Sequence, residues 1–246
     1  MANQSTASTI GSIPKFESTL VIAFPDVLLA GPKILLSAAD AHTNGTSIPT
    51  WSHYCSRSSK NSNAGSNSRS NFAATNKIQH STAAVDANQQ RMSLLTIVVA
   101  PPTMEQASYL CEAIVNQAQT SGTEKIILVA ASNFATKEQR THVVQIHHDG
   151  AVEFPAVPRD VALGDHILNT FLTLLTFAGV PTTALVHPAK KGTGLKESQT
   201  VLENLTTSLA LVIGDKNSAV FSAERAIQYS VLRSEDDGSV ESMMYL

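Results

Sequence analysis

The sequence predicts one α/β domain, a three-layer sandwich in which helices cover both faces of a mostly parallel sheet. Three observations predict this fold. Short segments that are almost continuously apolar indicate buried strands, longer segments with apolar residues at helical spacing indicate amphipathic helices, and the two kinds alternate along the chain. The 246 residues are enough to bury a sizeable core within a single domain.

The first strand is predicted over Ser18–Phe24, "STLVIAF", a short apolar run with β-branched residues that a proline follows. Asp26 is expected to cap a helix that starts near Val27. Gly31 and Pro32 indicate that the first turn of this helix is irregular, because neither residue is a regular helix former. These residues together predict the first strand, loop and helix unit.

A change of composition follows, from Ser52 to about Gln90. The stretch "SRSSKNSNAGSNSRSNFAATNK" is rich in serine and asparagine and has almost no large apolar side chains. Such a segment buries too little surface to offset its conformational entropy. We therefore predict a disordered insertion within the domain, over about residues 55–90.

The second strand is predicted over Ser93–Ala100, "SLLTIVVA", and a helix follows it. Thr103 and Gln106 form a capping box at the start of this helix, and Gly122 ends it. Apolar side chains recur at helical spacing at Met104, Ala107, Leu110, Cys111, Ile114, Val115 and Ala118. Cys111 on that face is interpreted as a small core residue rather than a reactive thiol.

The remaining elements follow from the same patterns. "KIILVAA" is typical of a central parallel strand buried on both faces, and "THVVQIHH" is more polar and is typical of an edge strand. Strands are predicted over Lys125–Ala131, Thr141–His148 and Thr182–His187, and helices over Leu163–Ala178, Leu195–Val212 and Ser222–Leu232. The predicted organisation is a flexible N-terminus over 1–17, the domain over 18–232, and a flexible tail over 233–246.

Charge and cysteine usage exclude several classes of function. The formal net charge is −3 and no basic run occurs, so neither nucleic acid nor an anionic membrane is an expected partner. The most apolar window, 167–186, contains Asn169, Gly179 and Pro181, which fit a membrane span poorly. Two cysteines without a CxxC motif indicate a reducing compartment, and the N-terminus does not have the pattern of a signal peptide.

Catalytic chemistry in such a fold would be expected where the parallel strands end. The predicted strand ends bring polar residues there: Asp26, the segment 101–103, Ser132 with Asn133, and the segment 187–191. Asp26, Ser132 and His187 could form a Ser/His/Asp set, although a chain with eight histidines offers many such triplets. No GxGxxG, P-loop or GxSxG motif is present. The alternative function left open is therefore a small-molecule hydrolase or transferase.

Two further candidates are weaker. The turn Gly192–Ser198, "GTGLKES", lies between a strand and a helix and could bind an anion, but a flexible turn between the two elements is the favoured interpretation. The side chains of His142, His147 and His148 are not expected to share a metal ion. On a strand, residues that are adjacent or five apart point to opposite faces. We predict no catalytic residue, no cofactor and no metal site.

The chain ends in "ESMMYL", and its last residues carry a resemblance. Met244, Tyr245 and Leu246 resemble the C-terminal hydrophobic-tyrosine-any motif of proteasome activators and of certain proteasome assembly chaperones. The stretch Leu163–His187 resembles the apolar helix and following strand of the proteasome assembly chaperone 1 family. "TLVIAF" followed by a helix resembles the opening strand unit of that family. The Ser/Asn-rich insertion has no counterpart in it.

This resemblance implies a non-enzymatic α/β chaperone that forms a heterodimer with a related chaperone 2-like subunit. The pair would bind the proteasome α-subunits on the outer face of the α-ring, promote assembly of the ring and block premature docking of a regulatory cap. The implied location is the cytoplasm, with the nucleus as a further site. Met244, Tyr245 and Leu246 would be the docking residues, inserted into an inter-subunit pocket.

The physical character of the tail fits that role. Residues 234–242 are polar, acidic and glycine-containing, as in a flexible tether. Met244 and Tyr245 supply an adaptable thioether and a ring with a polar tip, and the Leu246 carboxylate could pair with a lysine in a pocket. The alternative is that "MMYL" folds back onto the body of the domain as an edge strand or an apolar plug.

Overall fold

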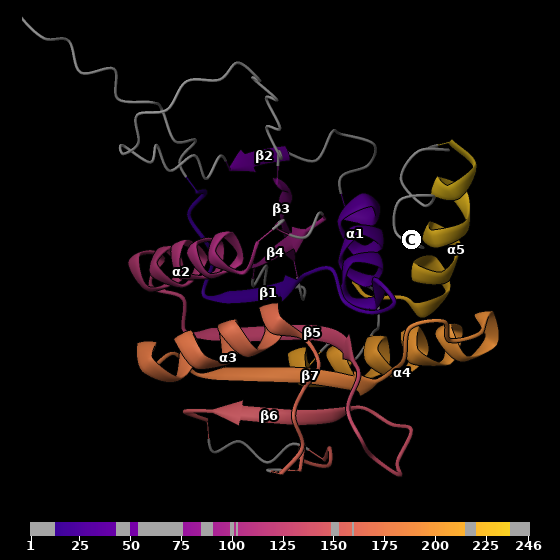
Figure 1. The fold of residues 1–246 in the computed structure, drawn as a ribbon. Helices are drawn as coiled ribbons and strands as arrows, with labels where there is room; N and C mark the ends of the chain where they lie inside the picture. Colours follow the sequence, from indigo (N-terminus) through magenta and orange to yellow (C-terminus); the bar gives the residue numbers. More distant parts are fainter. Residues whose placement is uncertain are drawn as a thin grey trace, which may run out of the picture.

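The computed structural model describes residues 13–42, 50–53, 76–84, 91–98, 101, 103–148, 153–158, 160–214 and 220–236. These residues form one seven-stranded sheet with the strand order β2-β3-β4-β1-β5-β7-β6. Helices lie on both faces of the sheet (Figure 1). The predicted three-layer α/β sandwich with a mostly parallel sheet is confirmed.

The elements alternate along most of the chain. The strands are β1 Thr19–Ala23, β2 Thr50–His53, β3 Asn76–Ala84, β4 Arg91–Ile97, β5 Lys125–Ser132, β6 His142–Ile146 and β7 Thr182–Pro188. The helices are α1 Ala30–His42, α2 Met104–Ser121, α3 His166–Ala178, α4 Leu195–Ile213 and α5 Ala223–Asp236.

The centre of the sheet is parallel and both of its sides are antiparallel. β4, β1, β5 and β7 pair in parallel, so that Val21 of β1 lies between Leu94 and Ile127. β6 is antiparallel to β7, and β3 is antiparallel to β4. The parallel strands are buried along almost their whole length because helices cover both of their faces, whereas β6 lies at the edge of the sheet and is less buried after Val143.

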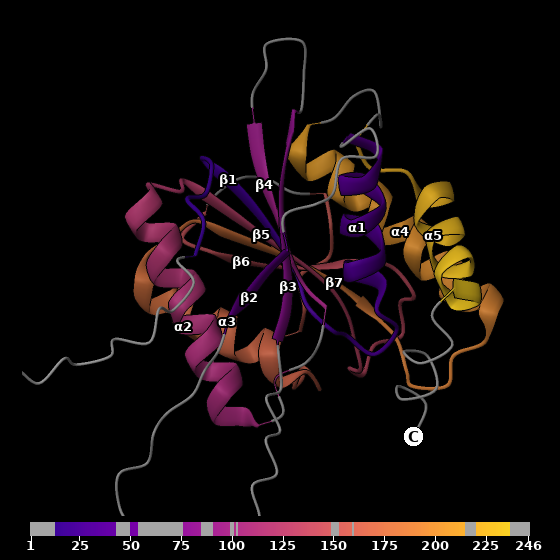
Figure 2. The same ribbon diagram turned by 90° about the horizontal axis from the view of Figure 1, so that it is seen from above.

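Two apolar cores lie on opposite faces of the sheet. Figure 2 shows α2 and α3 together on one side, and α1, α4 and α5 on the other. Successive residues of β5 alternate between the cores: Ile126, Leu128 and Ala130 pack on the α2/α3 side, and Ile127, Val129 and Ala131 pack on the α1/α4/α5 side. This alternation later decides which polar residues can meet.

Helix α2 confirms Thr103 and Gly122 as its caps, but the predicted capping box is only half formed, because the Gln106 side-chain oxygen has no hydrogen-bond partner. Thr103 accepts a hydrogen bond from the Gln106 backbone N–H, and Gly122 ends the helix with a φ of 76°. The predicted apolar positions are buried except for Met104, which is 66% exposed. Cys111 is a core residue as predicted, and burial raises the pKa of its thiol to about 12.

The predicted disordered insertion needs correction. Residues 76–84, which composition assigns to it, form strand β3, paired antiparallel with β4 and with β2. Ile78 and Ser81 are the buried side chains among those that the structure describes in this strand, and the strand is held in the sheet by its backbone pairing with β4 and β2. Composition does not reveal such a strand. The rest of the predicted insertion, 55–75 and 85–90, lies outside the described residues.

The predicted bounds of the domain also change at both ends. Phe16 is buried, and its backbone N–H donates to the Ser121 hydroxyl, so the domain begins before Ser18. At the other end α5 continues to Asp236, past the predicted boundary after residue 232. Met244, Tyr245 and Leu246 lie outside the described residues.

Two helices start later than predicted. α3 begins at His166 rather than at Leu163, because the Asp165 carboxylate accepts the Leu168 N–H and caps the helix there. α1 begins at Ala30 rather than near Val27. Among the described residues no helix combines the length and the apolar character that crossing a membrane would require.

Candidate functional site at the carboxyl end of the sheet

The carboxyl ends of β1, β5 and β7 lie at one edge of the sheet, and the polar residues predicted at strand ends are there. Asp26 follows β1, Ser132 and Asn133 are at the end of β5, and His187 is near the end of β7. Ser132, Asp26 and His187 are all buried. The sequence therefore predicted correctly that these polar residues gather at the carboxyl ends of the strands. Because the three side chains are buried, they have little access to a ligand from solvent.

Asp26 is a structural residue at this edge. Its Oδ1 accepts the backbone N–H groups of Leu28 and Ala30, and its Oδ2 accepts those of Gly31 and Ala131, at 2.9–3.0 Å. Burial raises the pKa of this carboxyl above its ordinary value, and the four hydrogen bonds oppose that shift. Both oxygens are occupied, so Asp26 joins the start of α1 to β5 and is not available to orient a histidine.

Ser132 and His187 do not form a pair, because the register separates them. His187 lies beside Ala131, and Ser132 lies beside Pro188. Since Ala131 packs on the α1/α4/α5 side, the next residue of the strand, Ser132, faces the other side of the sheet. The Ser132 hydroxyl is buried without a hydrogen-bond partner. The predicted Ser132, His187 and Asp26 set is therefore not assembled.

His187 is held by hydrogen bonds at both ring nitrogens. Its Nδ1–H donates to the Pro188 carbonyl at 2.9 Å, and the Asn204 side-chain amide of α4 donates to Nε2 at 3.1 Å. Burial lowers the pKa of His187, the Pro188 carbonyl opposes this, and nearby His142 lowers it further. Sequence reasoning missed Asn204, because nothing in a helical pattern marks which residue will face a strand end.

We expect His187 to make the protein less stable as the pH falls through about 6.5. The folded pKa lies below the ordinary value of 6.5, so in that range the unfolded chain binds a proton that folded His187 does not. The loss is at most about 1.4 kcal/mol per pH unit. Urea unfolding between about pH 7.5 and 5.5 should show a shallower pH dependence for His187→Gln than for the unaltered chain. Because both chains share all other titrating groups, the contribution of those groups cancels in the comparison. Equal slopes of the free energy of unfolding against pH would contradict this expectation.

An open hollow of about 1160 Å³ lies at the same edge. It is surrounded by the segment after β5, the segment before α3, the end of β7 and the first turns of α4. Its apolar lining is Phe134, Ala135, Pro158, Val161, Pro188, Ala189 and Val201. Lys137, Lys190 and Lys191 also line it, together with Asp160 and Glu197. It is an apolar hollow with a charged rim in which lysines outnumber acids.

The N-terminus of α4 forms part of this rim. Gly192 takes a φ of 83°, which reverses the chain after β7, and Gly194 is the N-cap of α4. Gly194 offers no side-chain oxygen to the first N–H groups of the helix, unlike Thr103 in α2 and Asp165 in α3. The first N–H groups of this 19-residue helix therefore have no side-chain cap. The predicted turn Gly192–Ser198 is thus at the hollow.

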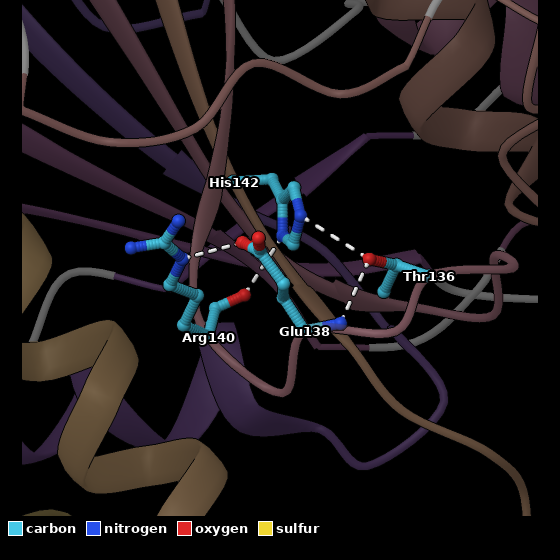
Figure 3. A network of polar contacts seen from close by, with 4 residues as sticks. All are labelled: Thr136, Glu138, Arg140 and His142. Atoms are coloured by element: carbon cyan, nitrogen blue, oxygen red, sulfur yellow. Dashed lines mark hydrogen bonds and ion pairs between the residues drawn. The ribbon is translucent and has the colours of Figure 1, made fainter.

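A network of polar contacts holds the wall that follows β5 (Figure 3). The Nδ1–H of His142 donates to the Arg140 carbonyl at 2.8 Å, and the Thr136 hydroxyl lies 3.4 Å from its Nε2. Arg140 also pairs with Glu138 at 2.6 Å, and the Glu138 N–H donates to Thr136. The network positions Thr136 and its neighbour Lys137 at the hollow, and no sequence pattern marked Lys137.

His147 and His142 each donate a hydrogen bond to a backbone carbonyl. His147, with a φ of 51°, follows β6 and has its Nε2 2.8 Å from the Thr176 carbonyl at the end of α3. His142 makes the contacts of the loop described above. Within the described ranges no group of three His, Cys, Asp or Glu residues is placed to hold a metal ion.

Solved structures share this fold. PbaB of Pyrococcus furiosus, an archaeal proteasome activator, has a TM-score of 0.56 at 13% identity, over 94% of this chain and 97% of that chain. PbaA of the same organism, an archaeal homolog of proteasome-assembly chaperone, has a TM-score of 0.55 at 14% identity, over 94% and 96%. A Thermoplasma acidophilum protein of unknown function has a TM-score of 0.50 at 11% identity, over 96% and 98%.

The likeness extends over nearly the whole of both chains in each comparison. At these identities it shows a common fold. No protein-family model and no curated protein matches the sequence. The function therefore has to be argued from the fold, the site and the ending together.

Proposed function

We propose that this protein is a proteasome assembly chaperone that acts by binding and not by catalysis. The observation that carries the proposal is the fold, which extends over more than nine-tenths of the lengths of PbaA and PbaB. A chaperone homolog and a proteasome activator are thus among the proteins that share it. The ending Met244-Tyr245-Leu246 supports the same role, because it has the pattern of a C-terminal docking motif.

The site chemistry supports binding over catalysis. Asp26 is saturated by backbone N–H groups, and both ring nitrogens of His187 are occupied. Ser132 faces the other side of the sheet from His187. The alternative left open by the sequence, a hydrolase or transferase, has no assembled catalytic set among these three described residues, and we do not propose it.

In the proposed mechanism, Met244, Tyr245 and the Leu246 carboxylate enter a pocket between two α-subunits. Burial of the apolar side chains supplies affinity, and a lysine of the pocket pairs with the carboxylate. The acidic segment after α5 serves as the tether. A related second chaperone is the proposed partner on the α-ring, and the cytoplasm is the proposed location.

The test is capture of proteasome α-ring intermediates by the tagged full-length chain and by a chain lacking residues 244–246. Capture should fall at least about tenfold on truncation if the tail supplies the proposed docking energy. Met243→Ala is the matched control, because it removes an apolar side chain outside the motif and should leave capture unchanged. One glycine added after Leu246 should act like the truncation, because it displaces the carboxylate.

Two outcomes would count against the proposal. If the full-length chain captures no proteasome subunit, the chaperone role is wrong for this protein. If the truncated chain captures the ring as well as the full-length chain does, another surface performs the docking.

A further inference from the structure

We propose that the hollow at the carboxyl end of the sheet binds a small polyanion, a molecule that carries two or more phosphate or carboxylate groups. This inference goes beyond the proposed chaperone function and does not depend on it. Three observations carry it: the place and size of the hollow, the charged side chains that solvent reaches in it, and the lack of ion pairs among those side chains.

The hollow lies where open α/β sheets bind small molecules. It is formed beyond the ends of two neighbouring parallel strands, β5 and β7, and beside the first turns of α4. Ligands of such sheets bind in the crevice outside the carboxyl ends of the strands. The volume of about 1160 Å³ is sufficient for a small molecule, since ligand sites typically measure about 300–1000 Å³. Place and size therefore fit a small ligand.

Charged side chains provide much of the surface that solvent reaches in the hollow. Phe134, Ala189 and Val201 line it but are buried, so apolar contact with a ligand is limited. Its exposed lining includes five charged side chains, namely Lys137, Lys190, Lys191, Asp160 and Glu197. Three of these five are cations. A ligand of this hollow is therefore recognised mainly by its charge.

Within the described residues, none of the three lysines forms an ion pair. Asp160 and Glu197 line the same hollow, but neither carboxylate pairs with a lysine there. An anion can therefore form charge-assisted hydrogen bonds with the ammonium groups without displacing a carboxylate. Lys137 is on the segment after β5, and Lys190 and Lys191 follow β7. Two anionic groups on one molecule can contact both segments, which favours a polyanion.

Several neutral polar groups of the hollow are already engaged within the protein. Both ring nitrogens of His187 have hydrogen-bond partners. The hydroxyls of Thr193 and Thr200 each donate to a backbone carbonyl. The Thr136 hydroxyl accepts a backbone N–H (Figure 3). The lysine ammonium groups are thus the strongest side-chain donors left for a ligand, and they select for negative charge.

The test is isothermal titration calorimetry of the full-length chain at low salt, with sodium pyrophosphate in one series and sodium citrate in another. We expect saturable binding of one anion per chain in at least one series. The double substitution Lys190→Ala and Lys191→Ala should weaken that binding at least about tenfold, because it removes two charge-assisted contacts.

Lys15→Ala with Lys196→Ala is the matched control. It removes the same charge from two exposed lysines that do not line the hollow, so the Kd should change by less than about twofold. Tighter binding of pyrophosphate than of citrate would support a phosphate ligand, and the reverse order would support a carboxylate ligand.

Two results would overturn the proposal: no saturable binding in either series, or a loss of affinity that is as large in the control variant as in the Lys190→Ala and Lys191→Ala variant. The titration contains no proteasome subunit. Its failure would therefore leave the proposed chaperone function standing, and failure of the α-ring capture would leave the polyanion site standing.

Discussion

Replacement of Asp26 by alanine is expected to lower the free energy of unfolding by at least about 3 kcal/mol. The carboxylate accepts four backbone N–H groups, three at the start of α1 and one from Ala131 in β5. Alanine leaves these donors without an acceptor where Asp26 itself is only 8% exposed. Buried donors without partners retain their full desolvation cost. The measurement is urea unfolding followed by circular dichroism.

Asp165→Ala is the matched control for this prediction. Asp165 is also an aspartate before a helix, and its Oδ1 accepts the Leu168 N–H at 2.8 Å. Its removal should cost about 1 kcal/mol, the usual value for an N-cap. If Asp26→Ala proves no more damaging than Asp165→Ala, Asp26 is an ordinary cap and does not connect α1 to β5. A chain that accumulates only as insoluble protein for Asp26→Ala, beside a soluble control, agrees with the prediction.

Gly31→Ala is expected to be equally damaging, although alanine is the better helix former. A Cβ at this position in α1 would lie 2.4 Å from the Val129 backbone oxygen of β5 and 3.1 Å from the Ala23 Cβ of β1. The first distance is far inside van der Waals contact, so α1 has to move away from the sheet. That movement would lengthen the Asp26 hydrogen bonds across the same junction. We expect a loss of about 3 kcal/mol or more in urea unfolding, opposite in sign to helix propensity.

Gly194→Ala tests whether the close approach is the cause. A Cβ at Gly194 meets no heavy atom within 4 Å, and its φ of −65° suits alanine. Its cost should be no more than about 1 kcal/mol, from the lower preference of alanine at an N-cap. If Gly31→Ala lowers the free energy of unfolding no more than Gly194→Ala does, α1 can move away from the sheet without penalty and the prediction is wrong.

Much of this fold could be predicted because its signals are local. The central strand β5 is apolar from Ile126 to Ala131, since helices cover both of its faces, and that pattern is visible in "KIILVAA". The caps of α2 were predictable for the same reason, because Thr103 and Gly122 act on backbone groups within one turn. The gathering of polar residues at the carboxyl ends of the strands was also predictable, because the carboxyl ends of parallel strands lie at the same end of a sheet.

Other features depend on contacts between distant segments. β3 is a strand because β4 supplies its hydrogen bonds, which its serine-rich surroundings do not indicate. Ser132 and His187 are separated by a one-residue difference in register between β5 and β7. The candidate hollow is formed by four segments that composition does not connect: the segment after β5, the segment before α3, the end of β7 and the first turns of α4. The contact between His142 and Thr136 helps to position the first of them.

The sequence by itself therefore determined the α/β class, the buried strands, the capped helices and the unusual apolar ending. Each of these depends on periodicity or on hydrogen bonds within a few residues. Only the tertiary structure decided that Asp26 connects α1 to β5 and that His187 accepts a hydrogen bond from Asn204. It also decided that three lysines gather around one hollow. Those features depend on strand register and helix placement, which are set by packing across the whole sheet rather than by any one segment.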